Sequence, residues 1–192
     1  DLHSFPTRRS SDLAYDQIEA VRAQAEAEKN ILDSVARLEA AVAKDPDTLS
    51  AWEILADHYN QTGDLERAQA AYEQVIRLDP KNGLAYAELA DVLVANQNGD
   101  LTGKVGEYAY KALEIDPWNQ KALMIGAAVA FDHADYKKAA MLFKRLQDQF
   151  PEGSEVYTAV NHNIEMAKDL GKFTELPKDP VGPKPQKEGM QM

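Results

Sequence analysis

The sequence WEILADHYNQTGDLERAQAAYEQVIRLDP, residues 52–80, predicts two helices joined by a tight turn. In the first helix, apolar and aromatic residues recur three and four positions apart, which places them on one helical face. Gly63 and Asp64 supply the turn, and Pro80 ends the second helix because proline cannot continue one. A single hairpin of this size cannot bury its own apolar face, so neighbouring hairpins are expected.

The same hairpin recurs along the chain. Four prolines, Pro46, Pro80, Pro117 and Pro151, follow one another at intervals of 34, 37 and 34 residues. The first hairpin also carries the tryptophan, leucine, tyrosine and alanine spacing of the tetratricopeptide repeat (TPR), a 34-residue helical hairpin. The longer interval reflects three extra residues in the loop 96–103. The sequence therefore predicts an all-α fold: a TPR helical-hairpin solenoid of about three repeats, flanked by an N-terminal helix and a C-terminal capping helix.

The segments outside the hairpins complete the domain organisation. Residues 14–46, rich in alanine and glutamate, predict one long leading helix or two shorter ones, a degenerate repeat. Residues 47–170 form the predicted TPR domain with its capping helix. Residues 171–192 contain four prolines and predict a disordered tail. Residues 1–13 resemble the translation of a sequencing-library adapter, the alternative being a disordered native arm.

Composition limits the classes of function. The formal net charge of −11 disfavours nucleic acid as a partner. The absence of cysteine excludes disulfides, thiolate metal sites and thiol nucleophiles. The four histidines lack the spacing of metal ligands, and no phosphate-binding, hydrolase or metalloprotease pattern occurs. We therefore predict a protein that is not an enzyme and needs neither a metal nor a cofactor.

A TPR stack has a concave groove lined by the first helix of each hairpin, and such a groove takes a helix or an extended peptide. Acidic residues there would favour a basic face on the client, and apolar residues would hold its apolar stripe. The alternative is that Met124 and Ile125 pack inside the stack and that the acids only solvate it. Helix geometry predicts the following groove residues: Glu53, Ile54, Asp57, Asn60, Glu88, Asp91, Met124, Ile125, Ala128, Phe131 and Asp132.

A finer resemblance comes from features around the repeats. The chain carries LEAAVAKDP at residues 38–46, a stretched loop with two glycines at 95–103, and the ending Phe-Pro-x-Gly-Ser at 150–154. Together these features resemble the C-terminal TPR domain of the CcmI (CycH) cytochrome c biogenesis proteins. The resemblance covers residues 30–170, and the loop and the ending are its most specific parts.

The resemblance implies a function for the chain. In that family the domain is periplasmic and follows membrane-spanning helices, so the parent protein would be anchored in the bacterial inner membrane through an N-terminal part missing from this chain. The domain acts there as an apocytochrome c chaperone: it holds the C-terminal helix of the apoprotein and presents it to the haem-ligation machinery. The alternatives are a general TPR interaction scaffold in another envelope assembly, or an enzyme that carries the TPR part as an appendage.

Overall fold

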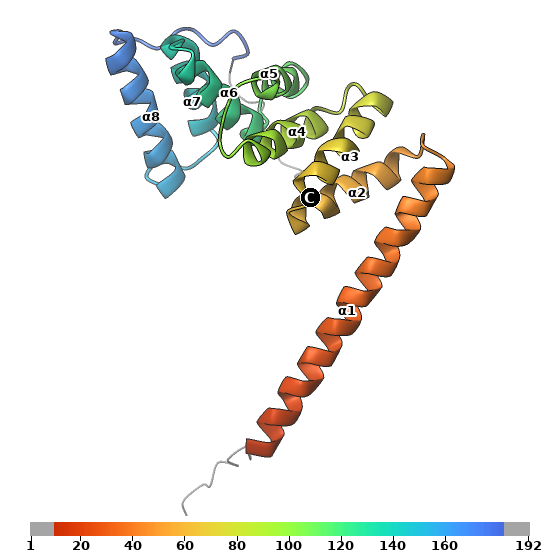
Figure 1. Ribbon diagram of the computed structural model, residues 1–192. Helices are drawn as coiled ribbons and strands as arrows, with labels where there is room; N and C mark the ends of the chain where they lie inside the picture. Colours follow the sequence, from red (N-terminus) through yellow and green to blue (C-terminus); the bar gives the residue numbers. More distant parts are fainter. Residues whose placement is uncertain (1–9, 183–192) are drawn as a thin grey trace, which may run out of the picture. The chain divides into compact units, whose positions relative to one another are not determined.

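The computed structural model describes residues 10–182, which form eight α-helices and no strand (Figure 1). The predicted all-α class is therefore confirmed. The chain divides into two compact units at residues 51 and 52, and each unit is described by itself. Within the described residues, no helix combines the length and the apolar character needed to span a membrane.

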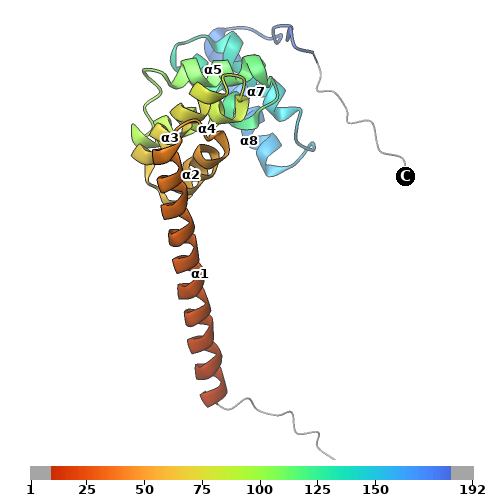
Figure 2. The same ribbon diagram turned by 90° about the vertical axis from the view of Figure 1, so that its right-hand side faces the viewer.

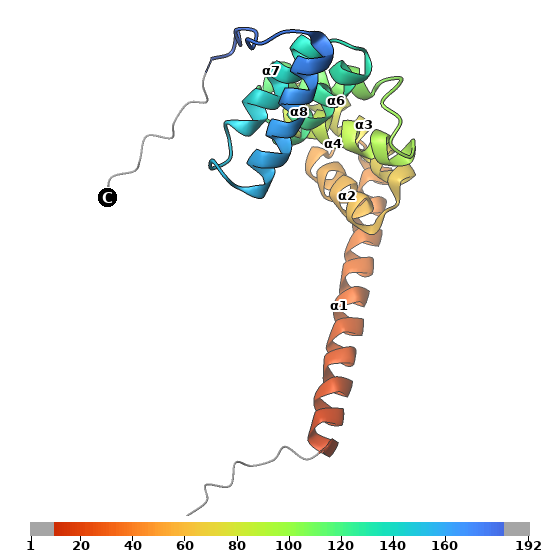
Figure 3. The same ribbon diagram turned by 90° about the vertical axis from the view of Figure 1, so that its left-hand side faces the viewer.

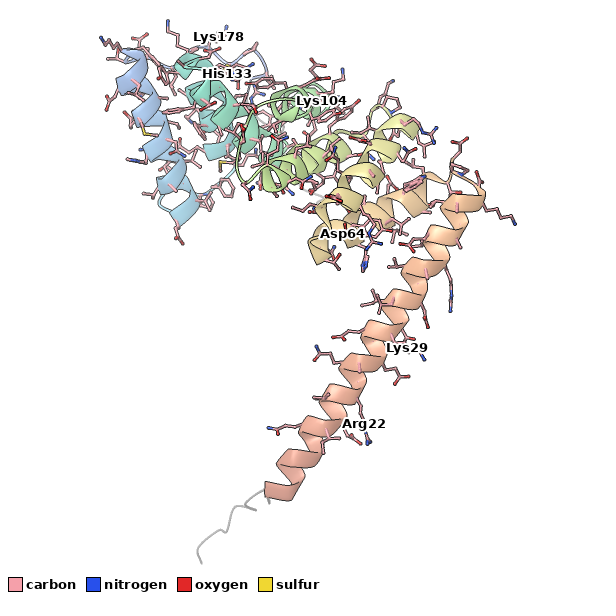
Figure 4. The ribbon with its side chains drawn as sticks, in the orientation of Figure 1. Arg22, Lys29, Asp64, Lys104, His133 and Lys178 are labelled. Carbon is pink, nitrogen blue, oxygen red and sulfur yellow. The ribbon has the colours of Figure 1, made fainter. Side chains whose placement is uncertain are left out.

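The first unit consists mainly of α1 (Ser10–Lys44), which Figure 2 and Figure 3 show as a single unbroken helix. From residue 17 to residue 34 its side chains are exposed, Arg22 and Lys29 among them (Figure 4). The helix begins inside the segment 1–13 that the sequence set apart, so four residues of that segment are helical. Residues 1–9 lie outside the described part, and the adapter interpretation remains a hypothesis.

The second unit is a stack of hairpins. Consecutive helices pack against each other from α3 through α8, and α4 also contacts α6, as expected when the first helices of adjacent repeats line up. The predicted TPR solenoid is confirmed. Its helices are α2 (Leu49–Thr62), α3 (Leu65–Leu78), α4 (Gly83–Asn96), α5 (Val105–Ile115), α6 (Gln120–Asp132), α7 (Tyr136–Gln147) and α8 (Glu155–Gly171).

Short polar residues begin most of these helices. The side chains of Asp64, Asn82, Asn119, Asp135 and Ser154 each accept a hydrogen bond from the backbone N–H three residues further on. Such a bond satisfies one of the amides that the first helical turn leaves without an intrahelical partner, and it stabilises a helix by about 1 kcal/mol. The caps therefore set where α3, α4, α6, α7 and α8 begin.

The core lies where the helices cross, and small residues allow them to cross closely. Ala68, Ala87 and Ala139 are fully buried. On α6, a Cβ atom added to Gly126 would lie 3.2 Å from the ring of Tyr110 on α5, and the Tyr110 hydroxyl donates to the Gly126 carbonyl at 3.1 Å. These contacts fix the crossing of the second repeat on the third.

The segment after α8 differs from the expected disordered tail. Phe173 and Leu176 pack against the core formed by α4 to α8. The Arg145 guanidinium on α7, whose side chain is only 4% exposed, donates to both carboxylate oxygens of Asp179, at 2.7 and 2.5 Å. It also donates to the Pro117 carbonyl at 3.2 Å. We call residues 173–182 the strap; residues 183–192 lie outside the described part of the chain.

Candidate partner-binding groove

The predicted groove residues fall into two groups in the second unit. One group lies on α2 and α4 and is acidic. The other lies on α6, and a pocket between α6 and α8 continues it. Both groups come from the first helices of their hairpins, as TPR geometry requires for a concave face.

The acidic cluster consists of Glu53, Asp57, Glu88 and Asp91. Hydrogen bonds join it to the neighbouring repeat: the Asn82 amide donates to Glu53 at 3.1 Å, and the Asn60 amide donates to Glu88 at 3.3 Å. Asn60 therefore takes part in the predicted site by linking α2 to α4. These bonds orient the carboxylates of Glu53 and Glu88.

Tyr72 on α3 lines the same cleft as Glu53, Asp57 and Glu88 of the acidic cluster. Its hydroxyl donates to the Asp57 carboxylate at 2.8 Å. Burial and this hydrogen bond both raise the pKa of Tyr72 well above its ordinary value. The phenol therefore stays a neutral donor, and it orients Asp57 beside Glu53 and Leu84 in the cleft between α2 and α4.

Lys121 at the start of α6 lies against the acidic cluster. Its ammonium is 2.6 Å from Glu88 and 2.8 Å from Asp91. Partial burial disfavours the charged form, but the hydrogen bonds to Asp91 and Glu88 outweigh it and raise the pKa of Lys121. The sequence did not predict this pairing, although Lys121 follows Leu84 by one 37-residue interval and so begins the next repeat. With one ammonium against four carboxylates, the cluster stays negative.

The apolar pocket is the second part of the groove. It has a volume of about 270 Å³ between α6 and α8. The ring of Phe131 is held edge-on to Tyr136, with 5.2 Å between ring centres. The pocket is lined by Leu101, Ala128, Phe131, Asp132, Phe143, Asn163 and Met166. Ala128, Phe131 and Asp132 were expected on this face, whereas Leu101 and the α8 residues were not.

The three expected aliphatic anchors, Ile54, Met124 and Ile125, differ in their exposure. Ile125 is buried, with 7% of its surface exposed, so its assignment to the groove was wrong. The reason is that α6 packs against α4, α5 and α7, and these three neighbours cover most of its circumference. Met124 and Ile54 are 42% and 54% exposed and remain available on the surface.

The chemistry of the described residues limits what this candidate site could bind. Residues 17–182, whose side chains the structure describes, contain no group of His, Asp and Glu side chains arranged to hold a metal ion. His133, at the turn after α6 (Figure 4), places its Nδ1 2.8 Å from the Val129 carbonyl, a local contact at the end of its own helix. A groove with a negative cluster and an apolar pocket suits another polypeptide.

The hairpin stack and its groove define a TPR protein-interaction module, a class that is typically non-catalytic. Two solved structures share the fold. The TPR2B domain of yeast Sti1, in its complex with pHsp70, has a TM-score of 0.51 at 17% identity, covering 63% of this chain and 96% of that one. The type IV pilus biogenesis factor PilW has a TM-score of 0.52 at 17% identity, covering 86% and 78%.

The family follows from the sequence. The model of the "Cytochrome c-type biogenesis protein H TPR domain" matches residues 15–157, and the chain belongs to this family. The resemblance predicted from the loop and the Phe-Pro-x-Gly-Ser ending is thereby confirmed.

Curated relatives carry matching names. The chain is 29% identical over 154 residues to the cytochrome c-type biogenesis protein CycH of Rhizobium meliloti (strain 1021), and 26% identical over 170 residues to CycH of Pseudomonas aeruginosa. These alignments cover 80% and 88% of this chain but only 38% and 41% of the relatives. NrfG of Escherichia coli O157:H7, a subunit of the formate-dependent nitrite reductase complex, is 30% identical over 111 residues, covering 58% of this chain and 56% of NrfG.

Proposed function

We propose that this domain is an apocytochrome c chaperone in cytochrome c maturation. It holds the C-terminal helix of the apoprotein, in the periplasm, as part of a membrane-anchored protein that works beside the haem-ligation machinery. Membership of the biogenesis family supports the pathway. The observation that carries the choice of client is the presence, in one unit, of a negative cluster on α2 and α4 and of an apolar pocket beside α6. That combination suits an amphipathic helix with lysines beside its apolar stripe.

The mechanism is capture of a helix in the groove. The apolar stripe of the client contacts Phe131 and Met124, and its lysines lie near the acidic cluster. When haem is attached and the cytochrome folds, the same helix becomes buried in the cytochrome core. The folded product therefore binds more weakly than the apoprotein, which releases the client without an energy source.

Peptide binding tests the proposal. We would measure fluorescence anisotropy of a labelled C-terminal-helix peptide from a c-type cytochrome with the full chain, in about 0.1 M and about 1 M salt, where the Debye length falls from about 10 to about 3 Å. Saturable binding that weakens in high salt, and that folded holocytochrome does not displace, supports the chaperone. An absence of binding at concentrations up to about 100 μM would overturn it, since that leaves less than about 5.5 kcal/mol of binding free energy.

Phe131→Ala is expected to weaken peptide binding about tenfold, because truncating an aromatic anchor in an interface commonly costs more than 1 kcal/mol. Circular dichroism should show unchanged helicity, because Phe131 lies in the last turn of α6 and is only partly buried. Val156→Ala on α8 is the matched control: it also removes an exposed apolar side chain, 42% exposed, but outside the pocket. Equal affinity for wild type and Phe131→Ala would remove Phe131 from the site.

Lys121→Met is expected to tighten peptide binding about threefold in low salt, because it removes the one ammonium that neutralises Glu88 and Asp91. The gain should disappear in high salt, where charges are screened. Lys111→Met provides the control, since that lysine pairs with Glu114 on α5, outside the acidic cluster. Weaker binding by Lys121→Met, or a gain that high salt preserves, would contradict a role for the acidic cluster in client binding.

A further inference from the structure

The loop between α4 and α5 is the place where the repeat interval departs from 34 residues. Its backbone is strongly bent: Asn98, Gly99 and Gly103 all have positive φ, at 54°, 90° and 71°. The loop is also tied by local hydrogen bonds. The Gly99 N–H donates to the Val94 carbonyl at 2.8 Å, and the Thr102 N–H donates to the Asp100 carboxylate at 2.8 Å. The extra residues therefore adopt a defined shape.

Leu101 is the side chain that this shape turns inward. The residues from Ala95 to Asp100 and from Thr102 to Lys104 are exposed, whereas Leu101 is partly buried. It lines the apolar pocket beside Phe131 of α6, Phe143 of α7 and Met166 of α8. A side chain from the second repeat thus forms a wall of a pocket that belongs otherwise to the third repeat and the capping helix.

The size and lining of the pocket indicate what it can hold. Its volume of about 270 Å³ lies below the lower limit of about 300 Å³ for small-molecule sites, so it suits a single side chain better than a cofactor. Leucine, phenylalanine and methionine line it, and the unbranched Met166 can adapt its shape to an occupant. Asp132 and Asn163 stand among these apolar residues and can face the polar flank of a bound helix.

We propose that this pocket takes one large apolar side chain of the client helix, and that Leu101 sets the size of side chain accepted. The inference rests on the proposed function, because the occupant is the same amphipathic helix. Charge complementarity selects that occupant: the acidic cluster, on α2 and α4 of the same unit, attracts its basic residues. The client helix therefore binds with its apolar anchor at α6 and α8 and with lysines toward α2 and α4.

A double-mutant cycle tests the role of Leu101. Three client peptides would differ at one apolar position, carrying leucine, alanine or tryptophan there, and each would be titrated against wild type and Leu101→Ala by anisotropy. We expect wild type to bind the leucine peptide about tenfold more tightly than the alanine peptide. Leu101→Ala enlarges the pocket, so it should lose most of that preference and bind the tryptophan peptide at least threefold more tightly than wild type does.

Two controls separate this role from a general defect. Leu84→Ala removes a leucine from α4 that is 63% exposed and lies in the acidic cleft, so the order of peptide affinities should stay as in wild type. In methyl NMR of methionine-labelled protein, the Met166 signal should shift on peptide binding. The chemical shift of Met141 on α7, which does not line the pocket, should stay unchanged. Circular dichroism confirms that each variant is folded.

The outcomes distinguish the two proposals. If the peptides bind wild type but Leu101→Ala leaves their order unchanged and Met166 does not shift, the pocket assignment is wrong and the chaperone function stands. If no peptide binds wild type, both proposals fall together. Both proposals are supported if Leu101→Ala changes the order of peptide affinities as expected and if the Met166 methyl signal shifts on peptide binding.

Discussion

Replacing Asp179 with alanine is expected to lower the free energy of unfolding by about 3 kcal/mol, because it leaves the Arg145 guanidinium buried without its carboxylate. That side chain is 4% exposed, and its other hydrogen-bond partner is the Pro117 carbonyl, at 3.2 Å. In a domain of this size, the loss corresponds to a fall of about 6–12 °C in Tm. Urea unfolding followed by circular dichroism measures the change.

The matched control, Asp148, lies directly after the last residue of α7, the helix that carries Arg145. Asp148→Ala removes an ion pair to Lys144 in which both side chains are exposed, and such pairs contribute about 0–1 kcal/mol. Its effect on stability should therefore be small. An Asp179→Ala protein as stable as wild type would show that the Arg145–Asp179 ion pair does not contribute to the stability of the fold.

The dependence on pH gives a second measurement of the same pair. Partial burial of Asp179 works against ionisation, but hydrogen bonds from Arg145 and from the Val181 N–H outweigh it and lower the pKa of Asp179 below its ordinary value of 3.8. The ionised carboxylate therefore stabilises the folded state above pH 3.8, and this contribution is lost as the pH falls through the lower, folded-state pKa. The stability difference between wild type and Asp179→Asn should be constant near neutral pH and shrink only below pH 3.8. A difference that grew on acidification would contradict the assignment.

Leu123→Ala is the second large effect, with an expected loss of about 3 kcal/mol, within the range of about 2–5 kcal/mol for truncating a buried leucine. Leu123 is fully buried on α6, within the core that joins α4 to α8. The truncation removes apolar contacts and leaves a cavity, since close-packed helices relax only partly around it. Urea unfolding would measure the loss, and a change below about 0.5 kcal/mol would show that the core is packed differently.

The adjacent residue provides the comparison. Met124 is 42% exposed, so Met124→Ala should leave the free energy of unfolding within about 0.5 kcal/mol of wild type. It should nevertheless weaken peptide binding, because in the proposed complex Met124 contacts the apolar stripe of the client. The two neighbouring variants are therefore expected to separate an effect on stability from an effect on binding. A Met124→Ala protein that binds as wild type would restrict the apolar contacts to the pocket.

The sequence predicted features that depend on neighbouring residues well, and features that depend on residues far apart in the chain poorly. Prolines, caps and the three-four spacing are local signals, and they predicted the hairpins and the face of α2 and α4 that carries the acids. Ile125 was misplaced because α6 has three packed neighbours, a property of the stack that helix periodicity does not contain. Leu101 could not be assigned, since the path of its loop depends on three positive φ angles.

The strap shows the same limit at longer range. The prolines of the tail predicted disorder. The composition of the tail does not reveal that Asp179 pairs with a buried arginine, Arg145, 34 residues earlier in the chain. The available signal was a charged residue, Arg145, on the mostly apolar buried face of α7. An arginine among buried alanine, leucine and phenylalanine positions needs a carboxylate from elsewhere in the chain.

The border of the family and the border of the folding unit are different. The family model ends at residue 157, three residues into α8, yet Val160, Ile164 and Ala167 further along that helix are part of the core. A fragment that ends at residue 157, where the family model ends, would therefore expose the apolar surface of α7 that α8 covers. Exposed apolar surfaces of this kind promote self-association. Similarity to relatives therefore identifies the repeats, whereas a fragment that stays in solution also needs the rest of α8, which the family model does not include.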